Sequence, residues 1–309
     1  MAADKNGGNN GLTERSLNME YRYDNLTMDN RYKAIKEKLF IDCSNCSGLC
    51  CVDLYFAKSE GFPYDKPAGE PCKNLMEDFR CKIHDTLLEK KMKGCLAYDC
   101  FGAGQKVTSV IYNGASWRAS QQVTEQMSAV FLIITRLHQM LWYLIEASSI
   151  CATKDLWEDI ARLIEENNHM TDITPDKILE LDLEQYKKRV DRILKKSSDL
   201  VALSFKKPEG QEKQENTDKE KMSDYIGKNL QKKDLAGKDF SLCLMIAANI
   251  KGCKLKGANF LGTDMRDTNI EDADLSESFF LTQGQINAAR GNAGTKLPAG
   301  LIRPLTWKS

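Results

Sequence analysis

The sequence lacks both a net charge and long apolar runs. Its 309 residues carry 44 basic and 44 acidic side chains, so the formal net charge is zero. A balanced charge gives no global attraction to nucleic acid or anionic membranes, and we do not expect nucleic acid as a partner. The opening segment, MAADKNGGNNGLTERS, has no apolar core of the kind that a secretion signal needs. We therefore expect a cytoplasmic protein.

No uncharged apolar stretch is long enough to mark a membrane span. The most apolar window, residues 129–145, is interrupted by Arg136, His138 and Gln139. This interruption favours a helix that is buried or that faces a partner, so we expect no membrane association.

Cysteine, in contrast, is abundant, and eight of the 11 cysteines fall within one stretch of the chain. Without an export signal these thiols should stay reduced, and a dense reduced cluster is typical of a metal site. Cys151, Cys243 and Cys253 stand apart, and we expect them to be small buried apolar residues. The predicted metal ligands are Cys43, Cys46, Cys50, Cys51, Cys72, Cys81, Cys95 and Cys100.

The run CSNCSGLCC places four thiols within nine residues. A C-x-x-C pair lets two thiolates hold one ion from a tight turn. The vicinal side chains of Cys50 and Cys51 tend to point apart, so they serve two ions, or one ion and another role, more easily than one tetrahedral site. The cysteine count allows two sites with four ligands each. His84, in the run CKIH, is more typical of a residue that supports a ligand than of a ligand.

The cluster resembles the CxxCxxCC family of zinc- or iron-chelating proteins, because Cys81, Ile83 and His84 match its C-x-I-[YH] element. It departs from that family in having three residues between Cys46 and the vicinal pair, and in lacking the Arg-Pro that often follows the C-x-I element. A related cluster in flagellin lysine methylases is thought to hold an iron–sulfur centre. The resemblance thus implies an iron–sulfur cluster or zinc, and thiolates suit both.

Helical patterns dominate the middle of the chain. Apolar residues recur at spacings of three and four over residues 119–149, which predicts a long helix whose seam needs cover from other helices or from a second subunit. The sequence therefore allows a homodimer in which the second subunit covers this seam. We expect a second helix over 154–168 and a third from Pro175 to about residue 196, capped by Thr174. The charged run over 206–225 predicts a linker, and residues 1–40 predict a flexible arm that ends in a short helix.

A period of five residues governs the C-terminal part of the sequence. Two positions before most of the large apolar residues stands a small or slender one, from Cys243 to Ser278. Neither a helix nor a strand repeats every five residues, so the chain must turn a corner in each unit. The large apolar residues are Leu230, Leu235, Phe240, Met245, Ile250, Leu255, Phe260, Met265, Ile270, Leu275 and Phe280.

Segments such as KGANFLG and EDADLSE make this region similar to the pentapeptide-repeat family, with its pattern A-[DN]-[LF]-x-x. The resemblance implies a right-handed square β-helix with four pentapeptides per coil. We therefore predict a multidomain α+β protein. Its parts would be a cysteine-rich metal module (41–112), a small helical bundle (113–205), a pentapeptide-repeat β-helix (226–282), and a C-terminal cap and tail (283–309).

These modules favour a metal-binding protein whose repeats offer a rigid face to a protein partner. The first alternative is a modifying or group-transfer enzyme with the cysteine cluster near its active site, although the sequence defines no catalytic residue. A second is protection of topoisomerases by DNA mimicry. The outward residues of the repeats change from basic to acidic along the module, which argues against a uniformly acidic DNA mimic.

Overall fold

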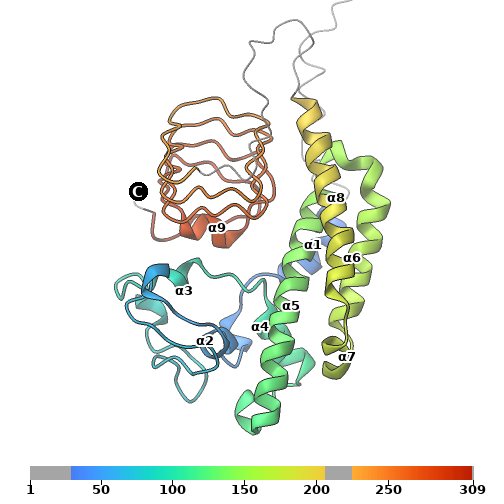
Figure 1. Cartoon of the computed structure of the whole chain (residues 1–309), viewed down its shortest axis with the longest axis vertical. Coiled ribbons are helices and arrows are strands. Elements are labelled where there is room, and N and C mark those ends of the chain that lie inside the picture. Colours follow the sequence, from blue (N-terminus) through green and yellow to red (C-terminus); the bar gives the residue numbers. More distant parts are fainter. Residues whose placement is uncertain (1–28, 206–224, 308–309) are drawn as a thin grey trace, which may run out of the picture.

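The computed structural model describes residues 29–205 and 225–307, so the expected arm over 1–28 and most of the expected linker lie outside the described residues. Figure 1 shows three bodies: a stack of repeat coils, a loop-rich cysteine module below it, and long helices that run beside both. The helices are α1 (Asp29–Lys38), α2 (Leu49–Asp53), α3 (Lys93–Ala97), α4 (Ala103–Gln105), α5 (Gln121–Ser148), α6 (Trp157–Thr171), α7 (Pro175–Leu179), α8 (Leu183–Ser204) and α9 (Gln283–Ala288).

Helix α5 forms the centre of the fold. The seam predicted from its spacing is buried, and α1, α2, α6, α7 and α8 all pack against this helix. By length and composition α5 could cross a membrane, but 56% of its most apolar window is buried inside the structure. Helices of the same chain therefore cover the apolar seam of α5. The sequence alone had also allowed a second subunit to cover it.

The third predicted helix is divided in two. Helix α7 ends at Leu179, and α8 begins at Leu183, where the Asp182 carboxylate accepts a hydrogen bond from the Gln185 amide. Thr174 makes no side-chain cap at the start of α7, contrary to our prediction. A carboxylate cap at Asp182 satisfies a free amide at the start of α8, so the chain starts a new helix there.

The cysteine module contains little regular structure. Between residue 75 and α3 only a single 3₁₀ turn, His84–Thr86, forms. Two isolated antiparallel bridges, Phe56 with Lys66 and Leu75 with Cys81, join its loops. The buried side chains of Phe56, Cys72 and Met92 make a small core of their own.

The repeats stack with 20 residues per coil, but the predicted α+β class with a β-helix is wrong, because no β-strand occurs among the described residues. The coils are joined instead by isolated parallel bridges, such as Asn229 with Asn249 and Asn249 with Asn269. Each pentapeptide places a single residue in the extended pairing position before it turns. One residue per side is too short for a strand, so the described part of the protein is helical with a stack of turns.

Two devices recur at the corners of the stack. The residue two positions after the large apolar residue adopts a positive φ, as at Gly237, Gly252 and Asp267. Such a conformation suits a type II turn and explains the recurring glycines. The Asp or Asn before the apolar residue accepts a hydrogen bond from the amide two residues later, as Asn249 does from Lys251. This Asx turn gives a reason for the acidic or amide position in the repeat pattern.

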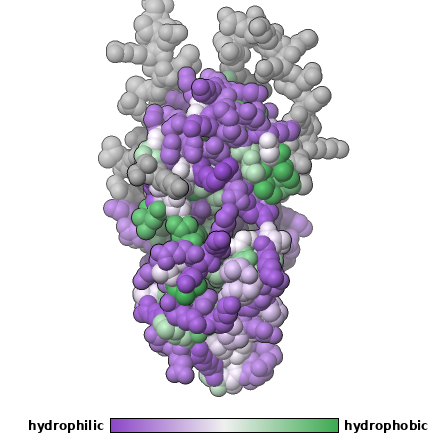
Figure 2. All heavy atoms as spheres, turned by 90° about the vertical axis from the view of Figure 1, so that its left-hand side faces the viewer, coloured by the Kyte–Doolittle hydropathy of each residue, from purple (hydrophilic) through white to green (hydrophobic). Residues whose placement is uncertain are grey.

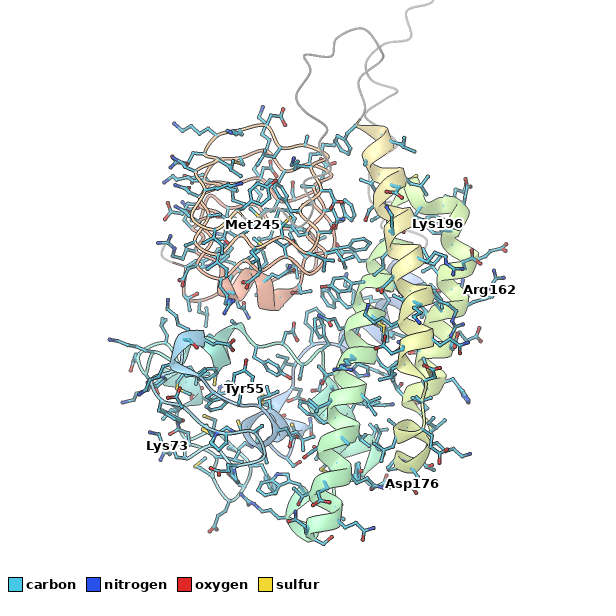
Figure 3. The ribbon with its side chains drawn as sticks, viewed as in Figure 1. Tyr55, Lys73, Arg162, Asp176, Lys196 and Met245 are labelled. Atoms are coloured by element: carbon cyan, nitrogen blue, oxygen red, sulfur yellow. The ribbon has the colours of Figure 1, made fainter. Side chains whose placement is uncertain are left out.

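The predicted inward positions are confirmed. From Phe240 to Phe280 every large apolar residue of the period is buried, as Met245 illustrates inside the coils in Figure 3. The small residues from Cys243 to Ser278 are buried too. Leu230 and Leu235, in the first coil, are only half-buried.

The last coil is closed by the C-terminal segment. Thr282 caps α9 through a capping box with Gln285, and the Trp307 indole nitrogen donates to the Ala289 carbonyl. The helical bundle does not close the other end of the stack. It lies along the side of the stack instead, where Phe205 contacts the corners at Gly237 and Gly257.

Candidate functional site

The eight predicted ligands all lie in the cysteine module and are free thiols. Cys43 opens a 3₁₀ turn that the Asp42 carboxylate caps, and Cys46 follows that turn. Cys50 and Cys51 lie in α2, Cys95 lies in α3, and Cys100 lies just before α4. The Cys72 amide donates to the Cys51 carbonyl, and the amide of Lys82, next to Cys81, donates to the Asn74 carbonyl, so backbone bonds tie the remaining loops to α2.

Four of these residues form a first thiol group: Cys43, Cys46, Cys50 and Cys100. Loss of hydration, followed by the neighbouring thiols of Cys46 and Cys100, raises the pKa of Cys43 to about 11. Burial, followed by Asp99 and Cys46, raises the pKa of Cys100 to about 11. The same four residues line one cavity, together with Cys95, so they face a common space.

The other four form a second thiol group: Cys51, Cys72, Cys81 and Cys95. Burial raises the pKa of Cys95 to about 12, and the thiols of Cys51, Cys72 and Cys81 add to the rise. Burial also raises the pKa of Cys81, to which Cys51 and Cys72 contribute. Tyr64 lies at this group, because its hydroxyl is 3.2 Å from the Cys72 sulfur.

The vicinal pair joins the two groups. The Cys50 thiol donates a hydrogen bond to Cys51, which lowers the pKa of Cys51 and raises the pKa of Cys50. Cys100 and Cys46 also raise the pKa of Cys50, whereas Lys66 helps to lower the pKa of Cys51. Cys51 also contributes to the raised pKa of Cys43 and of Cys46, so it acts on both groups, and the assignment of the pair to two sites stays a prediction.

A buried lysine stands beside the second thiol group. The Lys66 ammonium donates to the carbonyl oxygens of Val52, Pro67 and Glu70, at 3.0, 2.8 and 2.7 Å. Burial lowers the pKa of Lys66, and the nearby thiols of Cys72 and Cys51 oppose that change. A fixed positive charge here favours thiolates over thiols in the second group.

Backbone amides also point at the sulfur atoms. Amide hydrogen bonds from Leu49 and Gly48 act on Cys46, and those from Gly104 and Gly102 act on Cys100; each of them favours the thiolate. Gly104 is needed for a close approach, because a Cβ atom there would lie 2.6 Å from the Cys46 sulfur. Outer hydrogen bonds of this kind hold metal ligands in orientation.

The side chains, as they stand, do not converge on one point. Within residues 29–205 and 225–307, no three His, Cys, Asp or Glu side chains are arranged to hold an ion. His84 lies on an exposed turn, with its Nδ1 3.4 Å from the Asp85 carboxylate. Whether the eight cysteines are ligands therefore stays a prediction.

The cysteine module is docked directly onto the repeat stack. Helix α3, which carries Cys95, packs against α9, and a Cβ atom at Gly284 would lie 2.8 Å from the Ala97 carbonyl oxygen. The Lys93 ammonium pairs with Asp267 at 3.0 Å across this junction. On the bundle side, the Trp142 indole donates to the Leu281 carbonyl.

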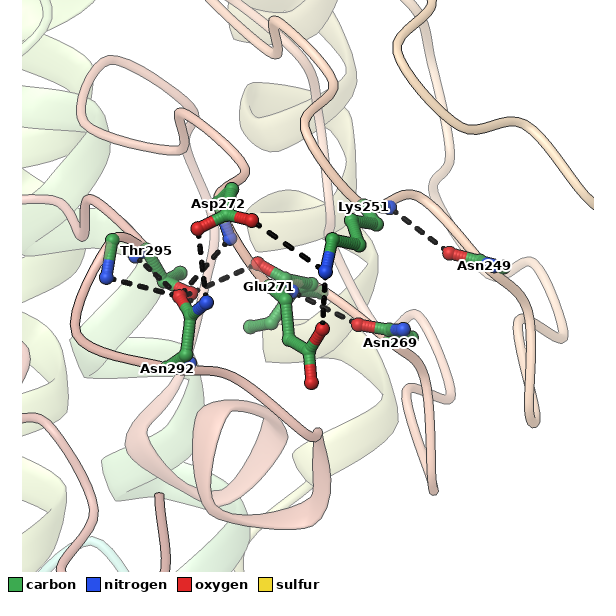
Figure 4. A network of polar contacts seen from close by, with 9 residues as sticks. Asn249, Lys251, Asn269, Glu271, Asp272, Asn292 and Thr295 are labelled. Carbon is green, nitrogen blue, oxygen red and sulfur yellow. Dashed lines mark hydrogen bonds and ion pairs between the residues drawn. The ribbon is translucent and has the colours of Figure 1, made fainter. Parts of the chain in front are cut away.

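The acidic residues on the surface of the late coils are paired with basic residues of the same protein. Lys251 pairs with Glu271 of the next coil at 2.8 Å and with Asp272 at 3.6 Å, as Figure 4 shows. Every one of the late acidic residues noted in the sequence has a basic partner, and the face in Figure 2 is hydrophilic with separate hydrophobic groups. The acidic residues are Asp264, Asp267, Glu271, Asp272, Asp274 and Glu277.

Known proteins resemble the chain in two ways. Residues 229–260 and 243–280 match the family described as pentapeptide repeats, with eight copies of the repeat. A Bacillus subtilis (strain 168) protein entitled "Uncharacterized protein YybG" is 41% identical over 270 residues, which cover 87% of this chain and 95% of that protein. The chain belongs to the YybG family.

The match to YybG covers most of the chain and therefore extends far beyond the repeats. The C-terminal module of the chain consists of pentapeptide repeats. The fusion to a CxxCxxCC-type domain stays a prediction. No solved structure matches the chain.

Sequence reasoning missed two residues of the site. Lys66 stands in the loop YDKPAGEPC, where nothing in the local pattern distinguishes it from a surface lysine. Gly104 belongs to the segment FGAGQK, which follows Cys100. The Gly-x-Gly that begins two residues after Cys100 was the available signal, because glycine allows the backbone to approach another group closely.

Proposed function

We propose that this protein binds metal through both thiol groups, in the cytoplasm, and that the repeat stack is a rigid scaffold for a protein partner. One observation carries the proposal: the eight cysteines of the module are all free thiols, five of them line one cavity, and a backbone hydrogen bond ties Cys72 to Cys51. Four thiolates are the ligand set of a structural zinc site and of common iron–sulfur clusters.

The surroundings of the two groups fit a metal centre. Cys43, Cys46, Cys50 and Cys100 would hold one centre, and Cys51, Cys72, Cys81 and Cys95 would hold the other. Four thiolates carry excess negative charge, and the Lys66 ammonium beside Cys51 and Cys72 would offset part of it. Zinc would cross-link the loops, whereas an iron–sulfur cluster would also transfer electrons.

Close packing at the junction between the cysteine module and the repeat stack supports the scaffold role. Cys95 lies in α3, and α3 packs on α9 at the end of the stack. A centre that includes Cys95 would therefore fix the position of the repeats relative to the cysteine module. Pentapeptide repeats often serve as protein-interaction modules, and partner binding is expected on the exposed coil faces.

The enzyme alternative is favoured by one observation, a cavity next to the first thiol group. DNA mimicry is not favoured, because the acidic residues of the late coils are paired with lysine or arginine.

The proposal is tested on full-length protein purified without air. Zinc and iron are measured by mass spectrometry, sulfide by chemical assay, and the absorption spectrum is recorded on the same sample. We expect one centre per thiol group, either as colourless zinc or as iron with sulfide and visible absorption. Protein that contains neither metal, before and after reconstitution with each, would refute the proposal.

A further inference from the structure

A cavity of about 580 Å³ lies where the three bodies of the protein meet. Its lining comes from the segment after α1, from the cysteine module, from Phe131 of α5, from Asn287 of α9, and from the C-terminal tail at Leu305 and Thr306. This volume falls within the range of small-molecule sites, roughly 300–1,000 Å³. All four residues of the first thiol group line it, together with Cys95.

Apolar side chains form most of the cavity wall, and the charged lining residues are of one sign. The aspartates Asp42 and Asp85 lie in the lining, and neither lysine nor arginine is among the lining residues. The Asp42 carboxylate already accepts hydrogen bonds from Ser44 and Asn45. His84 also lines the cavity, but its Nδ1 lies 3.4 Å from the Asp85 carboxylate. A phosphate or carboxylate group would meet neither lysine nor arginine here, so its desolvation would be poorly compensated. The apolar lining residues are Ile41, Leu87, Leu88, Leu96, Phe131 and Leu305.

The entrance is apolar, and its outer wall is held in place. Leu88 is 56% exposed and Leu305 is fully exposed, although both line the cavity. The tail that carries Leu305 is anchored by Trp307, which is buried and whose indole donates to the Ala289 carbonyl at 3.1 Å. A Cβ atom at Gly291 would lie 2.7 Å from the Trp307 ring, so the tail is closely packed at its anchor. The tail is therefore fixed two residues beyond Leu305, at Trp307.

We propose that this cavity binds a small organic molecule with a mainly apolar body and no negative charge, and holds it against the first thiol group. The inference goes beyond metal binding, because most of the lining comes from residues that are not among the predicted ligands, such as Ile41, Leu88 and Phe131. It identifies the class of molecule that a thiol-centred reaction or sensor at this site would act on.

The test uses two dyes and the full-length protein. Nile red is uncharged and apolar, whereas 8-anilinonaphthalene-1-sulfonate is apolar and anionic. We expect Nile red to bind saturably, with one molecule per chain, and the anionic dye to bind at least about tenfold more weakly, a difference of about 1.4 kcal/mol. Fluorescence titration measures both affinities.

Two substitutions locate the bound dye. Leu88→Lys and Leu305→Lys place a charge on opposite parts of the lining, and each should weaken Nile red binding about tenfold. Leu203→Lys is the matched control, because Leu203 lies on α8 and is also 56% exposed. Since all three positions are exposed, the variants should keep the thermal stability of the parent protein.

Equal affinity of Nile red for the parent protein, both cavity variants and the control would overturn the inference, as would tighter binding of the anionic dye. Metal content is measured on the same preparations. Nile red binding to a chain that takes up no metal would leave this inference standing and refute the proposed metal binding alone.

Discussion

Phe205, the residue after α8, lies so close to Gly257 that a Cβ atom at Gly257 would stand 2.1 Å from the Phe205 ring. Gly237, 20 residues earlier and therefore at the same corner of the preceding coil, contacts the same side chain. Both glycines have positive φ, +65° and +68°. The bundle thus docks on a corner of the stack where two consecutive coils lack a side chain.

Gly257→Ala should destabilise the protein by about 3 kcal/mol. The new methyl group would both strain the left-handed backbone, at about 1 kcal/mol, and overpack the Phe205 ring, at about 2 kcal/mol. Thermal unfolding followed by circular dichroism gives the change. Gly227→Ala is the control, because Gly227 has φ +63° with no atom within 4 Å of the added Cβ, so it reports the backbone strain alone. Equal losses in the two variants would mean that Phe205 does not dock there.

Lys66→Met should destabilise the protein and weaken its second thiol group. The substitution leaves the carbonyl oxygens of Val52, Pro67 and Glu70 without their common donor, which costs on the order of 3 kcal/mol. It also removes the positive charge next to Cys51 and Cys72, so metal bound at that group should be lost at lower chelator concentration. Denaturant unfolding and a chelator titration measure the two effects.

The exposed Lys58→Met is the control for that experiment, since Lys58 lies in the same module and its side chain is exposed. A Lys66→Met protein that keeps both its stability and its resistance to chelator would show that Lys66 neither stabilises the cysteine module nor supports metal binding at the second thiol group.

His138 should make the protein less stable as the pH falls below about 6.5. Burial lowers the pKa of His138 to about 4 from its ordinary value of 6.5, and its Nδ1 donates to the Phe101 carbonyl at 2.7 Å. Between these two values the unfolded chain binds a proton that the folded chain does not, so stability is complete above pH 6.5 and is lost toward pH 4. The loss reaches about 3 kcal/mol.

The pH effect is measured as the difference in unfolding free energy between the parent and His138→Gln at pH 7 and at pH 4.5. The variant should lose less stability on acidification than the parent. His169→Gln, at an exposed position on α6, serves as the control. A variant with the same pH dependence as the parent would assign the acid sensitivity to other groups.

How far the sequence could predict the fold depends on how local each signal is. The five-residue period was read correctly because each unit repeats the same inward positions, and α5 was read correctly because its seam extends over many turns. The backbone pairing between coils was harder to predict. Only one residue per unit pairs with the next coil, which is too few for a strand, so the predicted fold class with a β-helix was wrong. The division of the third predicted helix into α7 and α8 depends on the cap at Asp182, which the spacing of the apolar residues does not reveal.

The candidate site was predictable in composition but not in arrangement. Eight clustered cysteines are visible in the sequence, yet the division into two groups depends on loops that bring Cys100 toward Cys46 and Cys95 toward Cys81. Lys66 and the cavity arise from packing between distant segments, and single-sequence patterns carry no information about such contacts.

Substitutions in the two thiol groups should remove metal independently. Cys46→Ser, in the first group, and Cys81→Ser, in the second, should each lower the metal content by about half, because a serine oxygen is a poor substitute for a soft thiolate ligand. Cys253→Ser, inside the repeat stack, is the control and should retain all of the metal. Metal per chain is measured after anaerobic purification of each protein. If either substitution alone removed all of the metal, the eight thiols would form one coupled centre through the Cys50–Cys51 pair, and the division into two sites would be wrong.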